Sequence, residues 1–156
     1  MAIAITLKQY LSDNDIDYEA LTHPYTASSL MTAEESHIPG SRIAKGVVLK
    51  KGKDYLLAVL PASNHIHFEE IRNLLDQRVK LASEEEVESL FEDCEIGAVP
   101  PIGRAYGLEV LIDDSLSGNE DIYFEAGDHA TLIHVAGKQF GEMMGSARHG
   151  RFSYPG

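Results

Sequence analysis

The sequence has few of the features that direct a chain to a membrane or to an oxidising compartment. Cys94 is the only cysteine, so no disulfide can form within the chain. The N-terminal residues lack a basic segment followed by a long apolar run, and no later stretch is long and apolar enough to cross a bilayer. We therefore expect a cytoplasmic protein with no membrane partner.

Basic residues are also scarce. The chain has 13 Lys and Arg against 25 Asp and Glu, a formal net charge of −12. This balance argues against a protein that holds long nucleic acid through its phosphates. Five basic residues still gather in a short window: Arg42, Lys45, Lys50, Lys51 and Lys53. They can form a patch for one phosphorylated end of a large partner, or simply the solvated tip of a hairpin, and charge alone does not separate the two.

Several common catalytic motifs are missing. The sequence contains no GxSxG, P-loop, GxGxxG or HExxH motif, and His65 and His67 are too isolated to indicate a metal site. Cys94 lies between Asp93 and Glu95, whose charges would raise the pKa of its thiol and disfavour the thiolate. The sequence therefore predicts a site without metal or cofactor that uses few side chains.

The pattern of apolar residues predicts an α+β fold in one domain, residues 1–156, with a loosely held tail at residues 146–156. Helical spacing and capping patterns, including capping boxes at Thr6 and Ser83, predict helices near residues 6–12, 28–36, 68–75, 83–91 and 137–144. Apolar β-type runs predict strands at residues 17–21, 46–50, 55–60, 79–81, 108–112, 122–125 and 131–135. Residues 51–54 would close a hairpin, and the strands would curl into a mixed sheet or partial barrel.

Two side chains and one loop are candidates for chemistry. Lys45 at the mouth of a strand can bind an anion as a point charge, or it is an ordinary exposed lysine. His129, in a turn before a strand, can act as a base or a substrate partner, or it bonds only to backbone. The loop at residues 97–103 contains two glycines and two prolines. Such a loop can present fixed amides and carbonyls to water or an oxyanion, or serve as a stiff connector.

At these residues the chain resembles the YbaK family, which includes the editing domain inserted in bacterial prolyl-tRNA synthetases. The resemblance rests on motifs spread over most of the chain: His23-Pro24, Ala44-Lys45, and residues 58–62, 81–85, 94–103, 112–113 and 124–127 with His129. It implies a mixed, barrel-like sheet flanked by helices. It also implies an enzyme without cofactor that hydrolyses the ester between a wrong amino acid and the terminal adenosine of tRNA.

The resemblance also implies roles for individual residues. Lys45 and Gly97 match the catalytic positions: the lysine near the terminal phosphate or the aminoacyl group, the glycine in a loop whose backbone positions substrate and water. The expected substrate-binding residues are His23, Gly46, Ala98, Val99, Pro100, Pro101, Gly103, Gly127 and His129. An aminoacyl ester is already activated, so positioned water, a stabilised oxyanion and a ribose hydroxyl of the substrate suffice without a triad.

The expected substrate is alanyl-tRNA carrying a proline anticodon, with cysteinyl-, seryl- and threonyl-tRNA as alternatives. His129 favours alanine, whereas Gly46 stands where alanine-specific relatives often have asparagine. Binding is expected at the acceptor end only, weakly and salt-sensitively, with or without help from a synthetase. A non-catalytic aminoacyl- or nucleotide-binding module, or a regulatory domain, is the alternative from another functional class.

Overall fold

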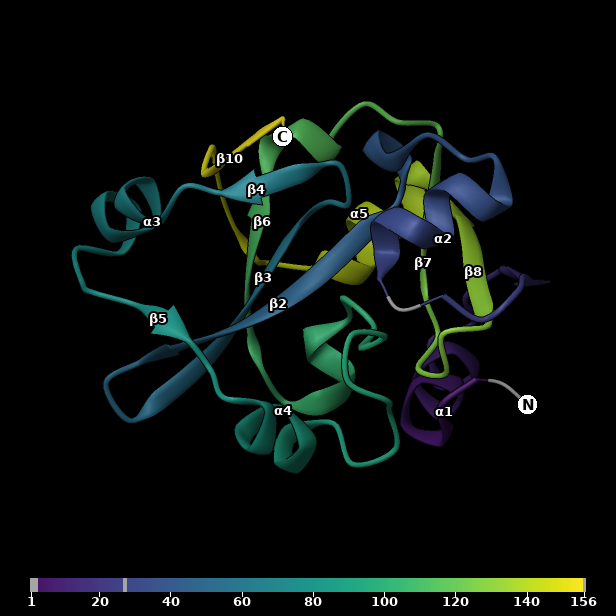
Figure 1. Cartoon of the computed structure of the whole chain (residues 1–156), viewed down its shortest axis with the longest axis horizontal. Helices are drawn as coiled ribbons and strands as arrows, with labels where there is room; N and C mark the ends of the chain where they lie inside the picture. The colour runs from purple at the N-terminus through teal and green to yellow at the C-terminus, as the bar shows by residue number, and fades with distance from the viewer. Residues whose placement is uncertain (1–2, 27, 156) are drawn as a thin grey trace.

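The computed structural model describes residues 3–26 and 28–155, and its elements follow the predicted order (Figure 1). The helices are α1 (Ile5–Asp13), α2 (Ser29–Ser36), α3 (Phe68–Leu75), α4 (Glu84–Leu90) and α5 (Gly137–Met144), with short 3-10 turns η1 (Gly40–Arg42), η2 (Gly103–Tyr106) and η3 (Asp114–Leu116). The strands are β1 (Glu19–Thr22), β2 (Ala44–Lys51), β3 (Asp54–Pro61), β4 (Asn64–Ile66), β5 (Lys80–Leu81), β6 (Glu109–Asp113), β7 (Asp121–Glu125), β8 (Thr131–Ala136), β9 (Arg148–Gly150) and β10 (Ser153–Pro155). The α+β prediction is confirmed, and β4, β9 and β10 were not predicted.

Within the described residues the strands form three sheets. A five-stranded mixed sheet has the order β5-β2-β3-β6-β9, and β1-β8-β7 and β10-β4 form smaller antiparallel sheets. The predicted hairpin is confirmed: β2 and β3 pair from Ala44↔Pro61 to Lys51↔Asp54, and Gly52 turns the chain with a φ of 60°. A bridge between Ile43 and Tyr123 joins the start of β2 to β7, so the two larger sheets curve into one barrel-like layer.

The β2–β3 hairpin separates two apolar clusters. On one face, Leu49, Leu56 and Phe152 pack with Ile71 of α3. On the other face, the larger cluster joins the hairpin to α1, α5, β7 and β8, as expected for side chains that alternate across a strand. Because the hairpin is covered on both sides, β3 is buried from Leu56 to Pro61. Its sequence is therefore a continuous apolar run rather than an alternating one.

The predicted capping box at Thr6 is wrong. Helix α1 begins at Ile5, its N-cap Ala4 has no side chain that can cap, and Thr6 lies inside the first turn. The backbone N–H of Thr6 instead donates to Oδ2 of Asp93 at 2.7 Å. A carboxylate at a helix N-terminus satisfies a free amide and interacts favourably with the helix dipole. A residue 87 positions away supplies the cap, so no local pattern could reveal it.

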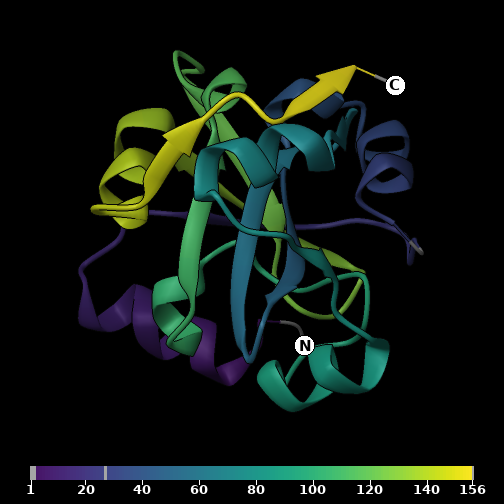
Figure 2. The ribbon, with the colours of Figure 1, turned by 90° about the vertical axis from the view of Figure 1, so that its left-hand side faces the viewer.

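The tail at residues 146–156 differs from the loosely held segment that we expected, since β9 pairs with β6 and β10 pairs with β4 (Figure 2). Phe152 is fully buried between them. The buried carboxylate of Asp113 accepts hydrogen bonds from the backbone N–H groups of Phe152 at 2.8 Å and Ser153 at 3.0 Å. The buried ring of Phe152 and the buried carboxylate of Asp113 thus fix a segment whose composition predicted a loosely held tail.

The cluster of basic residues does not form one open patch. Lys50 pairs with Glu86 at 2.9 Å, and Lys51 pairs with Glu109 at 2.7 Å. These contacts favour the interpretation of Lys50 and Lys51 as part of a solvated hairpin tip rather than of a phosphate-binding patch. Lys45 lies at the other end of β2 and is a separate charge. In the part of the chain that the structure describes, no helix is long and apolar enough to cross a membrane.

Replacing Asp113 by alanine is expected to free the C-terminal strands. The substitution would leave the N–H groups of Phe152 and Ser153 without their acceptor, at a cost of about 1–3 kcal/mol for each buried group. Urea unfolding should therefore show a markedly lower free energy of unfolding than wild type. Asp114→Ala, at the more exposed neighbouring position, is the control and should change it by less than about 1 kcal/mol. Equal effects of the two substitutions would contradict this role of Asp113.

Candidate active site

The loop at residues 95–103 is irregular but well packed. Gly97 has a φ of 87°, a left-handed conformation that other L-residues adopt at a cost. Residues 98–103 are buried, and the N–H of Glu95 donates to the carbonyl of Gly127 at 2.8 Å. Gly97 itself is exposed, next to this buried run. The loop therefore presents a fixed backbone at the surface, which is the property that positioning water or an oxyanion requires.

Gly46 lets the loop lie against strand β2. A Cβ added at Gly46 would be 3.3 Å from Cα of Pro101 and 3.0 Å from Cδ1 of Leu57. The side chain of Leu57 can give way, but the backbone of a buried proline cannot do so easily. A longer side chain at this position would thus meet Pro101 here. Gly46 acts by close packing between β2 and the loop.

Lys45 is half-buried, and burial lowers the pKa of its ammonium group. Its Nζ lies 3.5 Å from the carbonyl oxygen of Ala62, and within residues 3–26 and 28–155 it forms no salt bridge. A partly desolvated cation without a carboxylate partner attracts an anionic ligand more strongly than an exposed lysine does. This environment favours the anion-binding interpretation over that of an ordinary surface lysine.

His129 lies in the turn between β7 and β8 and is tied to the same loop. Its φ is 62°, its side chain is buried, and its Nε2 is 2.6 Å from the carbonyl oxygen of Ile96. Since a carbonyl only accepts, Nε2 carries the proton and Nδ1 of the neutral ring is an acceptor. The ring of Tyr25 packs on the imidazole at 5.1 Å, and the Tyr25 hydroxyl donates to Glu95 at 3.1 Å. His129 is thus both a turn histidine bonded to backbone and a positioned acceptor.

A buried carboxylate that the sequence analysis missed lies beside these residues. Glu125, at the end of β7, is 2% exposed, and its Oε1 is 3.7 Å from Nε2 of His23. Its Oε2 accepts from the Thr32 hydroxyl at 2.6 Å, and the Thr26 hydroxyl is 2.5 Å from that of Thr32. Burial raises the pKa of Glu125, although the Thr32 hydrogen bond and the nearby His23 and His129 oppose the shift. The available sequence signal for this buried carboxylate was a charged residue between two apolar residues, Phe124 and Ala126, both of which are buried in the structure.

Two glycines predicted to bind substrate lie in close packing contacts, which explain why glycine occupies these positions. A Cβ at Gly103 would lie 2.4 Å from Cγ2 of Val110, and one at Gly127 would lie 3.0 Å from Cβ of Ala4. Gly127 also has a φ of 114°. Ala98, Val99 and Pro100 are buried with the loop. The structure therefore brings Gly46, Pro101 and His129 onto the loop that contains Gly97, and it places His23 next to Glu125. Among the described residues, the Lys45 side chain bonds to the carbonyl of Ala62 rather than to this loop.

The environment of Cys94 disfavours its thiolate, as expected. Burial, more than the charge of Asp93, raises the pKa of the thiol to about 12, and Tyr106 contacts its sulfur at 3.3 Å. Among the described residues, no group of three or more His, Cys, Asp or Glu side chains is arranged to hold a metal ion.

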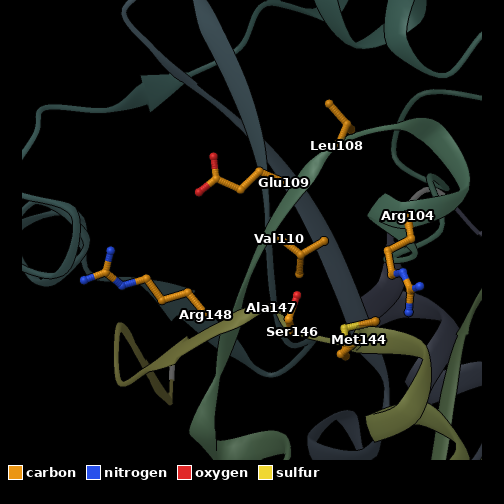
Figure 3. A pocket seen from close by; sticks show the side chains of 8 residues that line it. All are labelled: Arg104, Leu108, Glu109, Val110, Met144, Ser146, Ala147 and Arg148. Atoms are coloured by element: carbon orange, nitrogen blue, oxygen red, sulfur yellow. The ribbon is translucent and has the colours of Figure 1, made fainter.

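A separate pocket of about 280 Å³ lies between η2, the start of β6 and the end of α5 (Figure 3). Arg104 and Arg148 flank it, and Val110, Met144 and Ala147 contribute apolar surface. None of the residues singled out from the sequence as catalytic or substrate-binding lines it.

The buried Glu125 is expected to make stability depend on pH. Its folded-state pKa is raised, so the stability that its protonated form contributes is present below the unfolded pKa, about 4.3, and is lost as pH rises through the folded value. Glu125→Gln removes this loss, and its amide can donate to His23 while accepting from Thr32.

Chemical unfolding from pH 4 to pH 8, compared between wild type and Glu125→Gln, checks this expectation. The variant should gain stability relative to wild type as pH rises. A Glu125→Gln variant that loses stability relative to wild type at the higher pH would contradict the assignment.

Comparison with known protein families identifies a match. A family model for the aminoacyl-tRNA editing domain matches residues 23–142. Among curated proteins, no sequence matches the chain significantly.

Solved structures with the same fold are only distantly related in sequence. A protein named a candidate trans-editing enzyme for prolyl tRNA synthetase superposes with a TM-score of 0.85 at 21% identity, covering 97% of this chain and 96% of that one. The hypothetical protein APE2540 gives 0.84 at 19% identity, covering 96% and 99%. A candidate signal transduction protein from Marinobacter aquaeolei VT8 gives 0.72 at 16% identity, covering 96% of this chain and 30% of that one.

The region that matches the editing-domain family contains Lys45, the loop at residues 95–103 and the turn that carries His129. The structural matches cover 96% and 97% of the chain, more than the region matched by the family model. On this evidence the chain belongs to the aminoacyl-tRNA editing domain family.

Proposed function

We propose that this protein is a trans-editing deacylase that hydrolyses the ester of mischarged aminoacyl-tRNA. The observation that carries the proposal is the arrangement around one loop: Pro101 packs on Gly46 beside Lys45, and Ile96 accepts a hydrogen bond from His129. A rigid glycine–proline backbone and a buried imidazole acceptor thereby share one loop, and the partly desolvated cation of Lys45 follows in β2, one residue from the contact of Gly46 with that loop. The family match and the similarity to a candidate trans-editing enzyme support the same reaction.

In the proposed mechanism, Lys45 binds the terminal phosphate or the aminoacyl carbonyl as a point charge. The backbone at Gly97 positions the attacking water and stabilises the oxyanion, and a ribose hydroxyl next to the ester takes part in proton transfer. Hydrolysis needs little more than this positioning, because the aminoacyl ester is already activated. His129 Nδ1 accepts a hydrogen bond from the substrate and fixes its orientation.

Alanyl-tRNA carrying a proline anticodon is the proposed first substrate, with cysteinyl-, seryl- and threonyl-tRNA as alternatives. Ala98 and Pro101 are buried in the loop, and a wall of packed backbone would select by size against proline. Gly46, which packs on Pro101, has no side chain that could select alanine, so the choice of alanine depends on His129.

The second candidate function is a non-catalytic module that binds an aminoacyl or nucleotide ligand. The similarity to a domain within a much longer candidate signal transduction protein motivates this alternative. Lys45 would then contribute to affinity alone, and no substrate would be turned over.

The first test is hydrolysis of alanyl-, cysteinyl-, seryl- and threonyl-tRNA by wild type and Lys45→Ala. Loss of one charge-assisted contact costs about 1.5–3 kcal/mol, so kcat/KM should fall by about 10- to 100-fold. Lys45→Arg keeps the charge but not the compact ammonium group and should recover part of the activity. Lys53→Ala, at the exposed tip of the same hairpin, should leave activity unchanged. Wild type that binds these tRNAs but clears none of them would favour the binding module.

A second test separates the backbone role of Gly97 from simple strain. Gly97→Ala and Gly118→Ala both place alanine at a φ of 87°, so each should lose about 1–2 kcal/mol of stability. A Cβ at Gly118 would meet nothing within 4 Å. Only Gly97→Ala should also lose deacylation, by about tenfold or more, because it alters the loop that positions water. Thermal melts and single-turnover assays measure the two effects, and equal activity losses would argue against a catalytic role for this loop.

A further inference from the structure

The cluster around Glu125 holds an unusual set of buried polar atoms. Among the described residues, four buried side-chain nitrogen or oxygen atoms have no hydrogen-bond partner, and three of them are His23 Nε2, Glu125 Oε1 and His129 Nδ1. Each of these three side chains is more than nine-tenths buried. Buried polar atoms are nearly always paired, so three unpaired atoms in neighbouring residues call for a common explanation.

All three atoms are acceptors. His23 Nδ1 lies 2.7 Å from the carbonyl of Pro24 and must donate to it, so Nε2 of the neutral ring carries a lone pair. The bond from His129 to Ile96 leaves Nδ1 as an acceptor by the same argument. Glu125 accepts from Thr32 through one oxygen and keeps the other free. The three acceptor atoms therefore need hydrogen-bond donors, and one ligand group with several hydrogens would supply them.

The charge of the cluster points to a cation. A buried carboxylate without a counter-charge is costly, and the pKa of Glu125 is raised accordingly. A proton shared by His23 and Glu125 would satisfy two atoms and leave His129 Nδ1 unpaired. An ammonium group offers three N–H donors and one positive charge, which matches three acceptors and one carboxylate.

We propose that Glu125, with His23 and His129, binds the α-ammonium group of the aminoacyl ester and so makes the site selective for a free amine. The inference rests on the proposed function, since the aminoacyl ester supplies such a group next to the scissile carbonyl. The cluster lies just beneath the surface: Tyr25, which packs on His129, is 65% exposed, and residues 23–26 form neither helix nor strand.

The location of the cluster suits this role. His129 joins it to Ile96 and the Gly97 loop, where water would be positioned, and the α-amine is only one carbon away from the carbonyl that this water attacks. An ammonium held at Glu125 would therefore place the ester at the loop. Acylated amines, as in peptidyl- or formylated tRNA, would bring neither the charge nor the three donors.

The test uses a non-hydrolysable ligand, so that binding is measured apart from turnover. The ligand is an acceptor-stem RNA whose terminal adenosine carries alanine through an amide at the 3′ position, prepared with a free and with an N-acetylated amine. Wild type should bind the free amine about 10- to 100-fold more tightly, the effect of a charge-assisted hydrogen bond. Glu125→Gln should bring the ratio close to one while leaving affinity for the acetylated ligand within about twofold.

Thr32→Val is the matched structural control. It removes the hydrogen bond to the same carboxylate but keeps the negative charge, so it should destabilise the fold and still preserve the preference for the free amine. Glu125→Gln keeps the size of the side chain and both of its local contacts, and thermal melts verify that it folds. If Thr32→Val abolishes the preference as fully as Glu125→Gln does, the cluster serves packing alone and the proposal is wrong.

Two further results would also overturn the proposal: equal affinity of wild type for both ligands, or no binding of either one. Hydrolysis of alanyl-tRNA by the same preparations separates this inference from the proposed function. A Glu125-dependent amine preference without hydrolysis of alanyl-, cysteinyl-, seryl- or threonyl-tRNA would sustain the ammonium site and refute the deacylase. Hydrolysis of free and N-acetylated alanyl-tRNA at equal rates would sustain the deacylase and refute the ammonium site.

Discussion

The close approach of Pro101 to Gly46 is the contact on which the geometry of the site depends. Backbone meets backbone there with no side chain between, so the loop at residues 95–103 can lie flat against the β2–β3 hairpin. Lys45, one residue earlier in β2, is half-buried. From the other side, the hydrogen bond between His129 and Ile96 draws the β7–β8 turn onto the loop. Residues from three distant parts of the sequence thus share one rigid support, as a preorganised site requires.

Much of this arrangement could be predicted because its signals are local. The hairpin followed from two β-type runs around residues 51–54, the helix at Glu84–Leu90 from its capping box, and the irregular loop from its glycines and prolines. The helix cap supplied by Asp93 and the two C-terminal strands could not be predicted, because in each case the partner lies far away in the sequence. Long-range hydrogen bonds to backbone leave no periodic pattern.

The candidate site shows the same division. Lys45, Gly97 and His129 were accessible as motifs, whereas Glu125 looked like the polar end of an apolar strand. Its significance comes from burial and from the atoms that it leaves unpaired, which only three dimensions reveal. Conversely, Gly103 and Gly127 belonged to the family pattern but have sufficient reasons in packing. A shared motif therefore mixes residues kept for chemistry with residues kept for shape.

The environment of Cys94 has a practical consequence for handling the protein. A thiol with a pKa of about 12, packed against Tyr106, holds almost no thiolate at neutral pH. Alkylating reagents and peroxides act on the thiolate, so the native chain should remain unmodified in air and without added reductant. Once the chain unfolds, the same sulfur returns to ordinary reactivity. The single cysteine is thus a built-in chemical reporter that distinguishes folded from unfolded molecules, without any label that could disturb the site.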